Sequence, residues 1–143
     1  MSERIKELYQ EHILKKSKDE SLKGVVQNET HSLEAYNPMC GDKFTLSLRI
    51  KDEVVEDARF DGFGCAISKA STAVLTESII GKTRDEVAPL VKDFLELIDE
   101  NGSRNPETIF QDNQLLAFAA AREFPERKTC ASLSWDEVYK LVN

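Results

Sequence analysis

The sequence predicts an α+β fold in which helices cover a small antiparallel β-sheet. Apolar and polar residues alternate strictly from Lys43 to Lys51, which is the pattern of a half-buried strand. After a turn at Asp52 and Glu53, Val54 to Phe60 forms a second strand pattern, which ends where two glycines follow. Most of the remaining chain shows helical spacing. Gly24 to Leu33 is polar and receives no assignment.

Helical patterns flank these strands. Glu3 to Lys16 places its apolar side chains on one helical face. Cys65 to Ile80 is predicted as a helix with small residues on one side, and Gly81 is a stop signal. Thr83 to Glu86 fits the capping box of the next helix, although Pro89 favours a kink or a later start.

The last third of the chain reads as connectors and short helices. Asn101 to Gln111 is predicted as a polar connector, and Leu115 to Ala121 as a short alanine-rich helix. Pro125 suits the first position of a further helix, where its missing N–H costs nothing. Ser134 to Glu137 matches a second capping box, which predicts a separate final helix through Val142.

Length and composition exclude several classes of protein. The 143 residues are expected to form a single domain, residues 1–143. A net charge of −7 argues against a nucleic-acid partner, and no apolar run reaches the length of a membrane span. The first residues lack the apolar core of a secretory signal. We therefore expect a cytoplasmic protein, whose cysteines are metal ligands or catalysts rather than disulfides.

Three widely separated cysteines carry the most informative chemistry. They are Cys40, Cys65 and Cys130, and Asp42 stands two residues after the first of them. Three thiolates and one carboxylate make four ligands, the number of a tetrahedral zinc site. Cys65 lies at a predicted helix start, where backbone N–H groups favour negative charge. A carboxylate is a harder ligand than a thiolate, which favours a site that exchanges a ligand.

Four anionic ligands around zinc would leave a negative charge that needs compensation. The candidate cations near the predicted ligands are Lys43, Arg122, Arg127 and Lys128.

Each of these residues also has a structural interpretation. A lone cysteine is most often a small buried apolar residue. Asp42 is equally explained as a turn residue or an N-cap, and Arg127 and Lys128 as solvated surface charges. His12 falls on the apolar side of the first helix, which favours a packed histidine over a ligand. Trp135 is expected in the core or at a partner contact.

Three long motifs surround the cysteines in order. They are Asn-Pro-x-Cys-Gly-Asp at 37–42, Val-Glu-Asp-Ala-Arg-Phe-x-Gly-x-Gly-Cys-Ala-Ile-Ser at 55–68, and Phe-Pro-x-Arg-x-x-Cys-Ala-x-Leu-x-Trp at 124–135. Together they resemble the U-type iron–sulfur cluster assembly proteins, and the resemblance extends from about Tyr36 to the C-terminus.

Two branches of that superfamily differ at specific positions. IscU-type scaffolds carry a histidine just before the third cysteine, where this chain has Thr129, and a chaperone-binding Leu-Pro-Pro-Val-Lys run that 123–128 lacks. SufU-type proteins lack that histidine, carry Phe-Pro-x-Arg and have an insertion, which corresponds to 99–113 here. The chain resembles the SufU type more closely. It departs from that type at 15–18, where Lys-Lys-Ser-Lys replaces a Pro-Arg-Asn run.

The resemblance implies a SufU/IscU-like fold, with a three-stranded sheet and a metal at one exposed end. It implies a zinc-dependent sulfurtransferase that accepts persulfide sulfur from a SufS-type cysteine desulfurase and serves the downstream SUF machinery. Cys40, Asp42, Cys65 and Cys130 carry over as zinc ligands, and Cys40 as the sulfur acceptor. In the mechanism of the family, a desulfurase histidine replaces Cys40 on zinc. Arg127 is expected to hold negative charge and orient the partner during catalysis.

Two other functions fit the same residues. The first is an IscU-like scaffold on which an iron–sulfur cluster is assembled, so that the cofactor would be the cluster. The second is a structural zinc protein whose cysteines never react.

Overall fold

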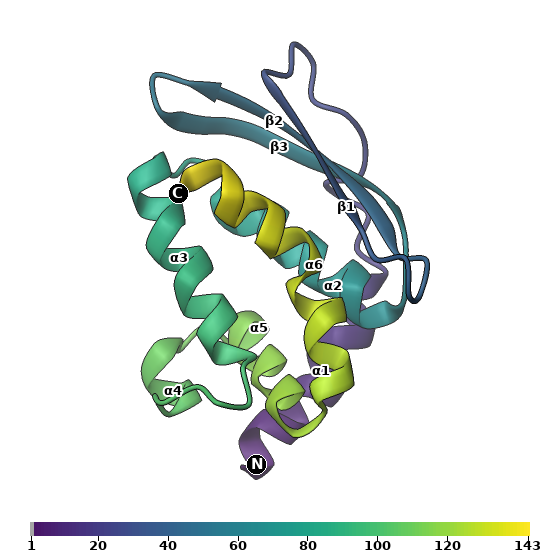
Figure 1. The fold of residues 1–143 in the computed structure, drawn as a ribbon, viewed down its shortest axis with the longest axis vertical. Helices are drawn as coiled ribbons and strands as arrows, with labels where there is room; N and C mark the ends of the chain where they lie inside the picture. The colour runs from purple at the N-terminus through teal and green to yellow at the C-terminus, as the bar shows by residue number, and fades with distance from the viewer. Residues whose placement is uncertain (1) are drawn as a thin grey trace.

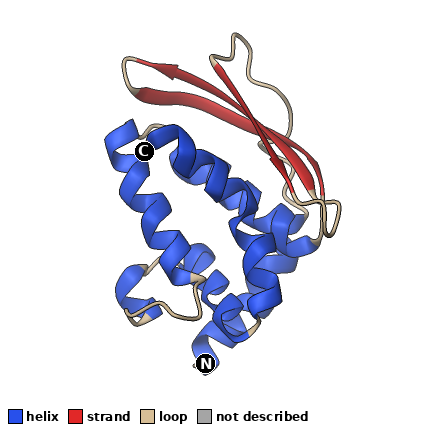
Figure 2. Cartoon of the chain, in the orientation of Figure 1, coloured by secondary structure: helices blue, strands red, loops and turns tan. Residues whose placement is uncertain are grey.

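The computed structural model describes residues 2–143, which form a three-stranded antiparallel sheet covered on one face by helices (Figures 1 and 2). This confirms the predicted fold class. The elements in chain order are α1 (Glu3–Ser17), β1 (His31–Tyr36), β2 (Lys43–Lys51), β3 (Val54–Phe63), α2 (Ala66–Ile79), α3 (Arg84–Leu97), α4 (Pro106–Ile109), α5 (Asn113–Leu116), the 3-10 helix η1 (Ala117–Glu123) and α6 (Pro125–Val142).

The central strand of the sheet is β2, which pairs with β1 on one side and β3 on the other. Its predicted alternation is confirmed, because Phe44, Leu46 and Leu48 are fully buried towards the helices. The prediction that β3 ends at Phe60 was wrong. Gly62 still pairs with Phe44, and it lies so close to β2 that an added Cβ would meet the Lys43 carbonyl oxygen at 2.1 Å.

The segment left unassigned, 24–33, contains the start of β1 and most of a strap that crosses the outer face of the sheet. The strap follows α1, and Leu22 and Gly24 exchange backbone hydrogen bonds with Phe60 of β3. Farther along, the backbone N–H of Val26 donates to the Ser47 hydroxyl at 2.9 Å, and both residues are buried. The strap therefore covers part of the face that the helices leave open.

Helices α2 and α6 pack against each other and against the sheet, with α1 and α3 outside them (Figure 1). The capping box at the start of α3 is confirmed, since Thr83 and Glu86 exchange side-chain and backbone hydrogen bonds. The later start that Pro89 favoured is wrong, because α3 begins at Arg84 and includes that proline.

The C-terminal third differs from the expectation in its helix boundaries. The predicted connector contains α4, and the predicted alanine-rich helix consists of α5 followed by η1. The separate final helix was wrong, because α6 runs unbroken from Pro125 to Val142. Ser134 does not cap a helix. Its side chain is buried inside α6, where its hydroxyl bonds to Thr72 of α2 at 2.7 Å.

Among residues 2–143, no helix combines the length and the apolar character needed to span a bilayer.

Candidate metal centre

The loop between β1 and β2 presents Cys40 and Asp42 at one end of the sheet. Asn37 and Asp42 close the loop with a backbone hydrogen bond of 2.9 Å, and the Asn37 carbonyl also accepts from the Gly41 N–H at 2.8 Å. Gly41 has φ +79°, which a residue with a Cβ adopts only with strain. The loop leaves Cys40 exposed while Asp42 turns inward and is buried.

Cys65 is the N-cap of α2. Its Sγ accepts from the backbone N–H of Ser68 at 3.5 Å, so the thiol occupies the position where a helix start favours an anion. The backbone N–H of Cys65 in turn donates to Asp42 Oδ1 at 3.2 Å. Asp42 thus joins the first motif to the second, and its turn-residue and N-cap interpretations do not describe its main contact.

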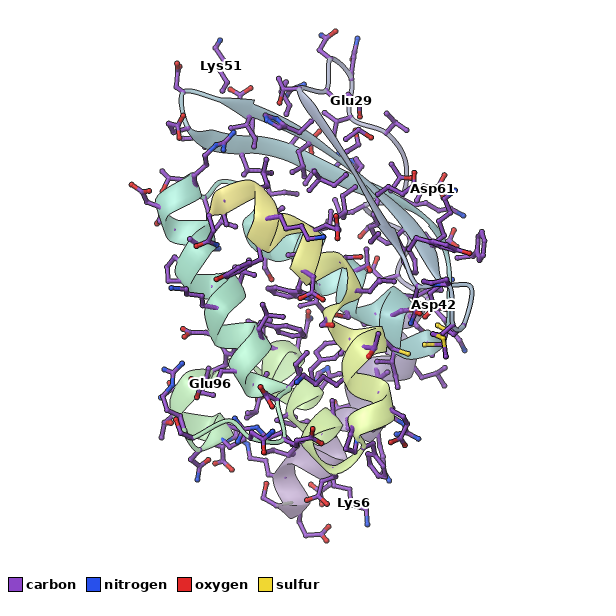
Figure 3. All side chains as sticks on the ribbon, in the orientation of Figure 1. Lys6, Glu29, Asp42, Lys51, Asp61 and Glu96 are labelled. Atoms are coloured by element: carbon purple, nitrogen blue, oxygen red, sulfur yellow. The ribbon has the colours of Figure 1, made fainter. Side chains whose placement is uncertain are left out.

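Cys130 comes from the second turn of α6 and completes the group. The ligand atoms of Cys40, Asp42 and Cys130 all lie within 4.8 Å of one another. The sulfur of Cys65 is outside this mutually close set but lies 3.9 Å from Asp42 Oδ2. Figure 3 shows sulfur atoms gathered beside the labelled Asp42. The structure therefore brings all four predicted ligand residues to one end of the molecule.

The Cys130 thiol is in an unfavourable place for a negative charge. Burial, then a hydrogen bond with Cys65 and the nearby charges of Cys65, Asp42 and Cys40, raise the pKa of the Cys130 thiol to about 12. This direction is what an anionic donor set produces when its members face one another.

The donor set fits a tetrahedral metal ion. Two sulfurs bound to the same zinc at about 2.3 Å are about 3.8 Å apart. Donor atoms that already lie within 4.8 Å of one another need only small side-chain movements to reach that spacing. Three thiols and a carboxylate suit zinc or iron better than magnesium or calcium, which prefer oxygen ligands.

Arg127 lies one helical turn before Cys130 on α6. Its guanidinium stacks 4.4 Å from the centre of the Phe124 ring and donates to the Tyr9 hydroxyl of α1 at 2.8 Å. With Cys65, it lines a hollow of about 360 Å³ between α1 and the start of α2. These contacts therefore hold Arg127 beside the cluster of cysteines, and it is not a freely moving surface charge.

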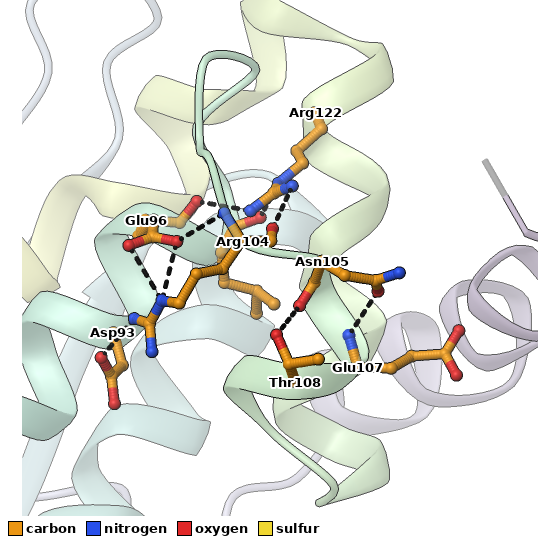
Figure 4. A network of polar contacts seen from close by, with 8 residues as sticks. Asp93, Glu96, Arg104, Asn105, Glu107, Thr108 and Arg122 are labelled. Atoms are coloured by element: carbon orange, nitrogen blue, oxygen red, sulfur yellow. Dashed lines mark hydrogen bonds and ion pairs between the residues drawn. The ribbon is translucent and has the colours of Figure 1, made fainter.

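Two cations expected to compensate the ligands have other partners. Arg122 donates to the backbone carbonyls of Glu96, Leu97 and Arg104 at 2.8–3.0 Å, so it fastens the end of α3 to the following loop (Figure 4). Lys128 pairs with Asp99 at 3.4 Å. Their closeness to Cys130 in sequence predicted a place near the site, but Arg122 on η1 and Lys128 on α6 pair with other groups.

Lys43 is exposed and pairs with Glu34 of β1 at 3.4 Å, beside the loop that carries Cys40. Neither histidine belongs to the group of close donor atoms found in residues 2–143. His12 is half-buried on α1 beside Glu11, and His31 lies in β1 with Thr30 and Arg84. The expectation of a packed or hydrogen-bonded His12 agrees with this position.

Sequence reasoning did not identify Ser68 and Tyr9 as residues that support the group. Ser68 stands three residues after Cys65, which is the standard position for a backbone donor to an N-cap, so its contact was readable from the sequence. Tyr9 is separated from Arg127 by most of the chain, and no local pattern could have joined them.

Comparisons with known proteins agree with this geometry. The family model described as "NifU-like N terminal domain" matches residues 8–131. The zinc-dependent sulfurtransferase SufU of Bacillus subtilis (strain 168) is 33% identical over 135 residues, which cover 94% of this chain and 89% of that protein. The iron–sulfur cluster assembly scaffold protein IscU of Thermotoga maritima is also 33% identical, over 91% of this chain and 89% of that protein.

Among solved structures, FiSufU from Fervidobacterium islandicum AW-1, a SUF-system scaffold protein by its description, superposes with a TM-score of 0.84. It is 31% identical in sequence, and the match covers 96% of this chain and 98% of that one. The chain therefore belongs to the NifU-like N-terminal domain family, as its resemblance to the U-type iron–sulfur cluster assembly proteins predicted.

Proposed function

We propose that this protein is a zinc-dependent sulfurtransferase that accepts persulfide sulfur from a SufS-type cysteine desulfurase. The observation that carries the proposal is the difference between the three thiols. Cys40 and Cys65 are both exposed, but Cys40 lies on a loop, whereas Cys65 caps a helix and the half-buried Cys130 lies within one. The SufU relative, which aligns over nearly the whole chain, supports the same reading. The protein would act in the cytoplasm and pass sulfur to the SUF cluster-assembly machinery.

Cys40, Asp42, Cys65 and Cys130 would hold the zinc ion, which their donor chemistry and proximity support. When bound, zinc supplies a redox-inert positive charge that keeps the thiols deprotonated. The Ser68 N–H and the Asp42 carboxylate orient Cys65 from two sides. Cys65 and Cys130 therefore serve as the fixed ligands, and Cys40 as the one that moves.

The chemical step is a thiol exchange. The Cys40 thiolate attacks the outer sulfur of the desulfurase persulfide. A new S–S bond forms between Cys40 Sγ and that sulfur, which keeps its proton. The former S–S bond breaks, and its electron pair leaves with the desulfurase cysteine as a thiolate. No oxidant or reductant is consumed.

A partially apolar rim around Cys40 supports docking of a protein that carries the persulfide. Met39 is 92% exposed directly beside Cys40, and Tyr36 and Phe63 are more than half exposed at the ends of β1 and β3. Large apolar side chains exposed together commonly mark partner contacts. Arg127, held by Tyr9 and Phe124, would add a positive charge that steadies the thiolates and orients the partner.

The test is mass spectrometry of the protein after incubation with a SufS-type desulfurase and cysteine. One added sulfur should map to Cys40, and Cys40→Ser should abolish both this mass and the stimulation of the desulfurase. Arg127→Ala should weaken transfer with zinc retained. A persulfide on Cys65 or Cys130, or full stimulation by Cys40→Ser, would overturn the assignment. Zinc binding without any stimulation would indicate a structural zinc protein.

A scaffold function is the second candidate, because the Thermotoga maritima relative named as an IscU scaffold is as similar to this chain as SufU. In that case the three thiols would bind an iron–sulfur cluster. Anaerobic incubation of the zinc-free protein with ferrous iron and sulfide distinguishes the scaffold function from the sulfurtransferase function. A stable coloured cluster that survives gel filtration would favour the scaffold, and a colourless zinc protein that stimulates the desulfurase would favour the transferase.

A further inference from the structure

Buried hydroxyl groups join α2, which Cys65 caps, to α6, which contains Cys130. The Ser71 hydroxyl of α2 donates to the backbone carbonyl of Ala131 at 2.5 Å and accepts from Trp135 Nε1 at 2.9 Å. At the next residue of α2, the Thr72 hydroxyl shares a hydrogen bond of 2.7 Å with the Ser134 hydroxyl of α6. All five residues are buried, so water does not compete for these contacts.

Trp135, the α6 residue that donates to Ser71, is itself fixed in the core. The Trp135 ring stacks on Phe94 of α3, with ring centres 3.8 Å apart and planes 6° from parallel. Phe118 of η1 packs edge-on against the same phenylalanine. Trp135 therefore has one face held by α3 while its N–H is held by Ser71 of α2. A tryptophan fastened on both sides fixes both the rotation of α6 and its position along its axis.

Cys130 and Trp135 belong to the same unbroken helix, so what holds Trp135 also places Cys130. Ala131, which receives the Ser71 hydrogen bond, is the next residue after Cys130. A shift of α6 by one residue would move Cys130 by about 1.5 Å along the axis and rotate it by about 100°. Metal ligand distances tolerate only about 0.2 Å, so a shift of this kind would remove Cys130 from the donor set.

We propose that Ser71 is a positioning residue for the metal centre, with Thr72 in support. The Ser71 hydroxyl sets the register between α2, whose N-cap is Cys65, and α6, which carries Cys130, and so determines how tightly and in what geometry the metal is held. The inference rests on the proposed metal site but does not depend on sulfur transfer.

An apolar contact between α2 and α6 would not set their register in this way. Ala70 and Ala73 of α2 are small and buried, and apolar packing between helices is not directional, so it does not by itself select one register. A buried hydroxyl with two partners on α6 is satisfied in only one register, because any other leaves the Trp135 N–H unpaired.

The experiment compares metal affinity in matched pairs of variants of the full-length protein. Ser71→Ala and Thr72→Val remove the contacts between the helices. Ser78→Ala and Thr76→Val are their controls, because these hydroxyls donate only to carbonyls of α2 itself, at 2.6 and 2.7 Å. The zinc dissociation constant is measured by competition with a chromophoric chelator, and the d–d spectrum is recorded with cobalt(II) as the probe of tetrahedral geometry.

Ser71→Ala should raise the dissociation constant for zinc by about tenfold, as loss of an outer support of a metal ligand does. Thr72→Val should raise it less, and both should alter the cobalt spectrum. The two controls should bind zinc as the wild type does even where they melt at a lower temperature. Equal losses of affinity in Ser71→Ala and Ser78→Ala, or an unchanged cobalt spectrum in Ser71→Ala, would overturn the proposal, as would failure of the wild type to bind zinc. Zinc binding by a wild type that does not stimulate a desulfurase would refute only the sulfurtransferase function.

Discussion

Gly64 lies against the carboxylate of Asp42, with no room for a side chain between them. A Cβ at Gly64 would sit 2.9 Å from Asp42 Oδ1 and 2.4 Å from the Ser68 hydroxyl. Real Cβ atoms do not approach other atoms this closely, so the glycine is required by space rather than by its backbone angles. The contact brings the residue before Cys65 directly onto the carboxylate that joins the first two motifs.

We expect Gly64→Ala to displace Asp42 and Ser68 and so to weaken the metal centre. Overpacking of this kind should lower the free energy of unfolding by about 1–3 kcal/mol, and zinc content after dialysis should fall. Urea denaturation and elemental analysis measure the two effects. Adding Ser68→Ala removes the closer of the two clashes and should restore part of the stability. If Gly64→Ala retained wild-type stability and zinc, the close approach would have no consequence.

Removal of zinc should lower the melting temperature, because the ion would join ligands from three segments that are distant in the sequence. A ligand present at a thousandfold its dissociation constant stabilises the folded state by about 4 kcal/mol. A chelator should therefore lower the melting temperature of the zinc-loaded wild type but leave the Cys130→Ala variant unchanged, because that variant has lost a ligand already. Differential scanning calorimetry with and without chelator tests this. Equal shifts in both proteins would mean that Cys130 is only a packed residue.

Arg104, in the loop after α3, and Arg122, on η1, should differ sharply in their contribution to stability. Arg122 places three donors on backbone carbonyls at the end of α3 and the loop after it, so Arg122→Ala should cost about 2–3 kcal/mol. Arg104 forms exposed ion pairs with Asp93 and Glu96, and Arg104→Ala should cost much less. Neither change should alter zinc affinity. Urea unfolding in parallel would show the contrast, and equal losses would contradict it.

Asp19 should make stability depend on pH in the acid range. Hydrogen bonds from the Ser21 hydroxyl and backbone N–H, and then from Lys16, lower the pKa of Asp19 from 3.8 to about 2. A carboxyl whose pKa is lower in the folded state stabilises it fully above the unfolded pKa, and this contribution is lost as the pH falls from about 4 to 2. The stability difference between wild type and Asp19→Asn should therefore shrink over that range.

Urea midpoints for the wild type and Asp19→Asn at pH 6 and pH 3 measure the effect. Ser21→Ala removes the main donor and should reduce the pH dependence. A difference that is the same at both pH values would show that the hydrogen bonds around Asp19 add no linked stability.

The sequence predicted the elements whose burial follows a clear period and missed those defined by long-range contacts. In β2 the alternating apolar residues Phe44, Leu46 and Leu48 are all buried, so the pattern identifies the strand. In β1 only Ala35 is buried, because an edge strand with one side open needs few apolar residues. Ser134 looked like an N-cap because its hydroxyl and Glu137 have the right spacing. In the folded protein that hydroxyl bonds to Thr72 on another helix instead.

The candidate centre was predicted from motif resemblance, not from spacing. Cys40, Cys65 and Cys130 are too far apart in sequence to form a short-range ligand pattern, yet the structure brings them to one end of the sheet. The residues that hold the group in place were not predictable in the same way. Ser71 and Tyr9 reach their partners only through the packing of whole helices.

The distribution of the four donor residues along the chain also has a consequence for synthesis. Cys40, Asp42 and Cys65 lie in the first half of the sequence, while Cys130 lies on α6, which leaves the ribosome after all three of them. Because domains fold as units while the chain emerges, the donor set stays incomplete until α6 has been released and has docked. A nascent or truncated chain without α6 would lack one thiol, so loading with metal would report that translation had passed Cys130.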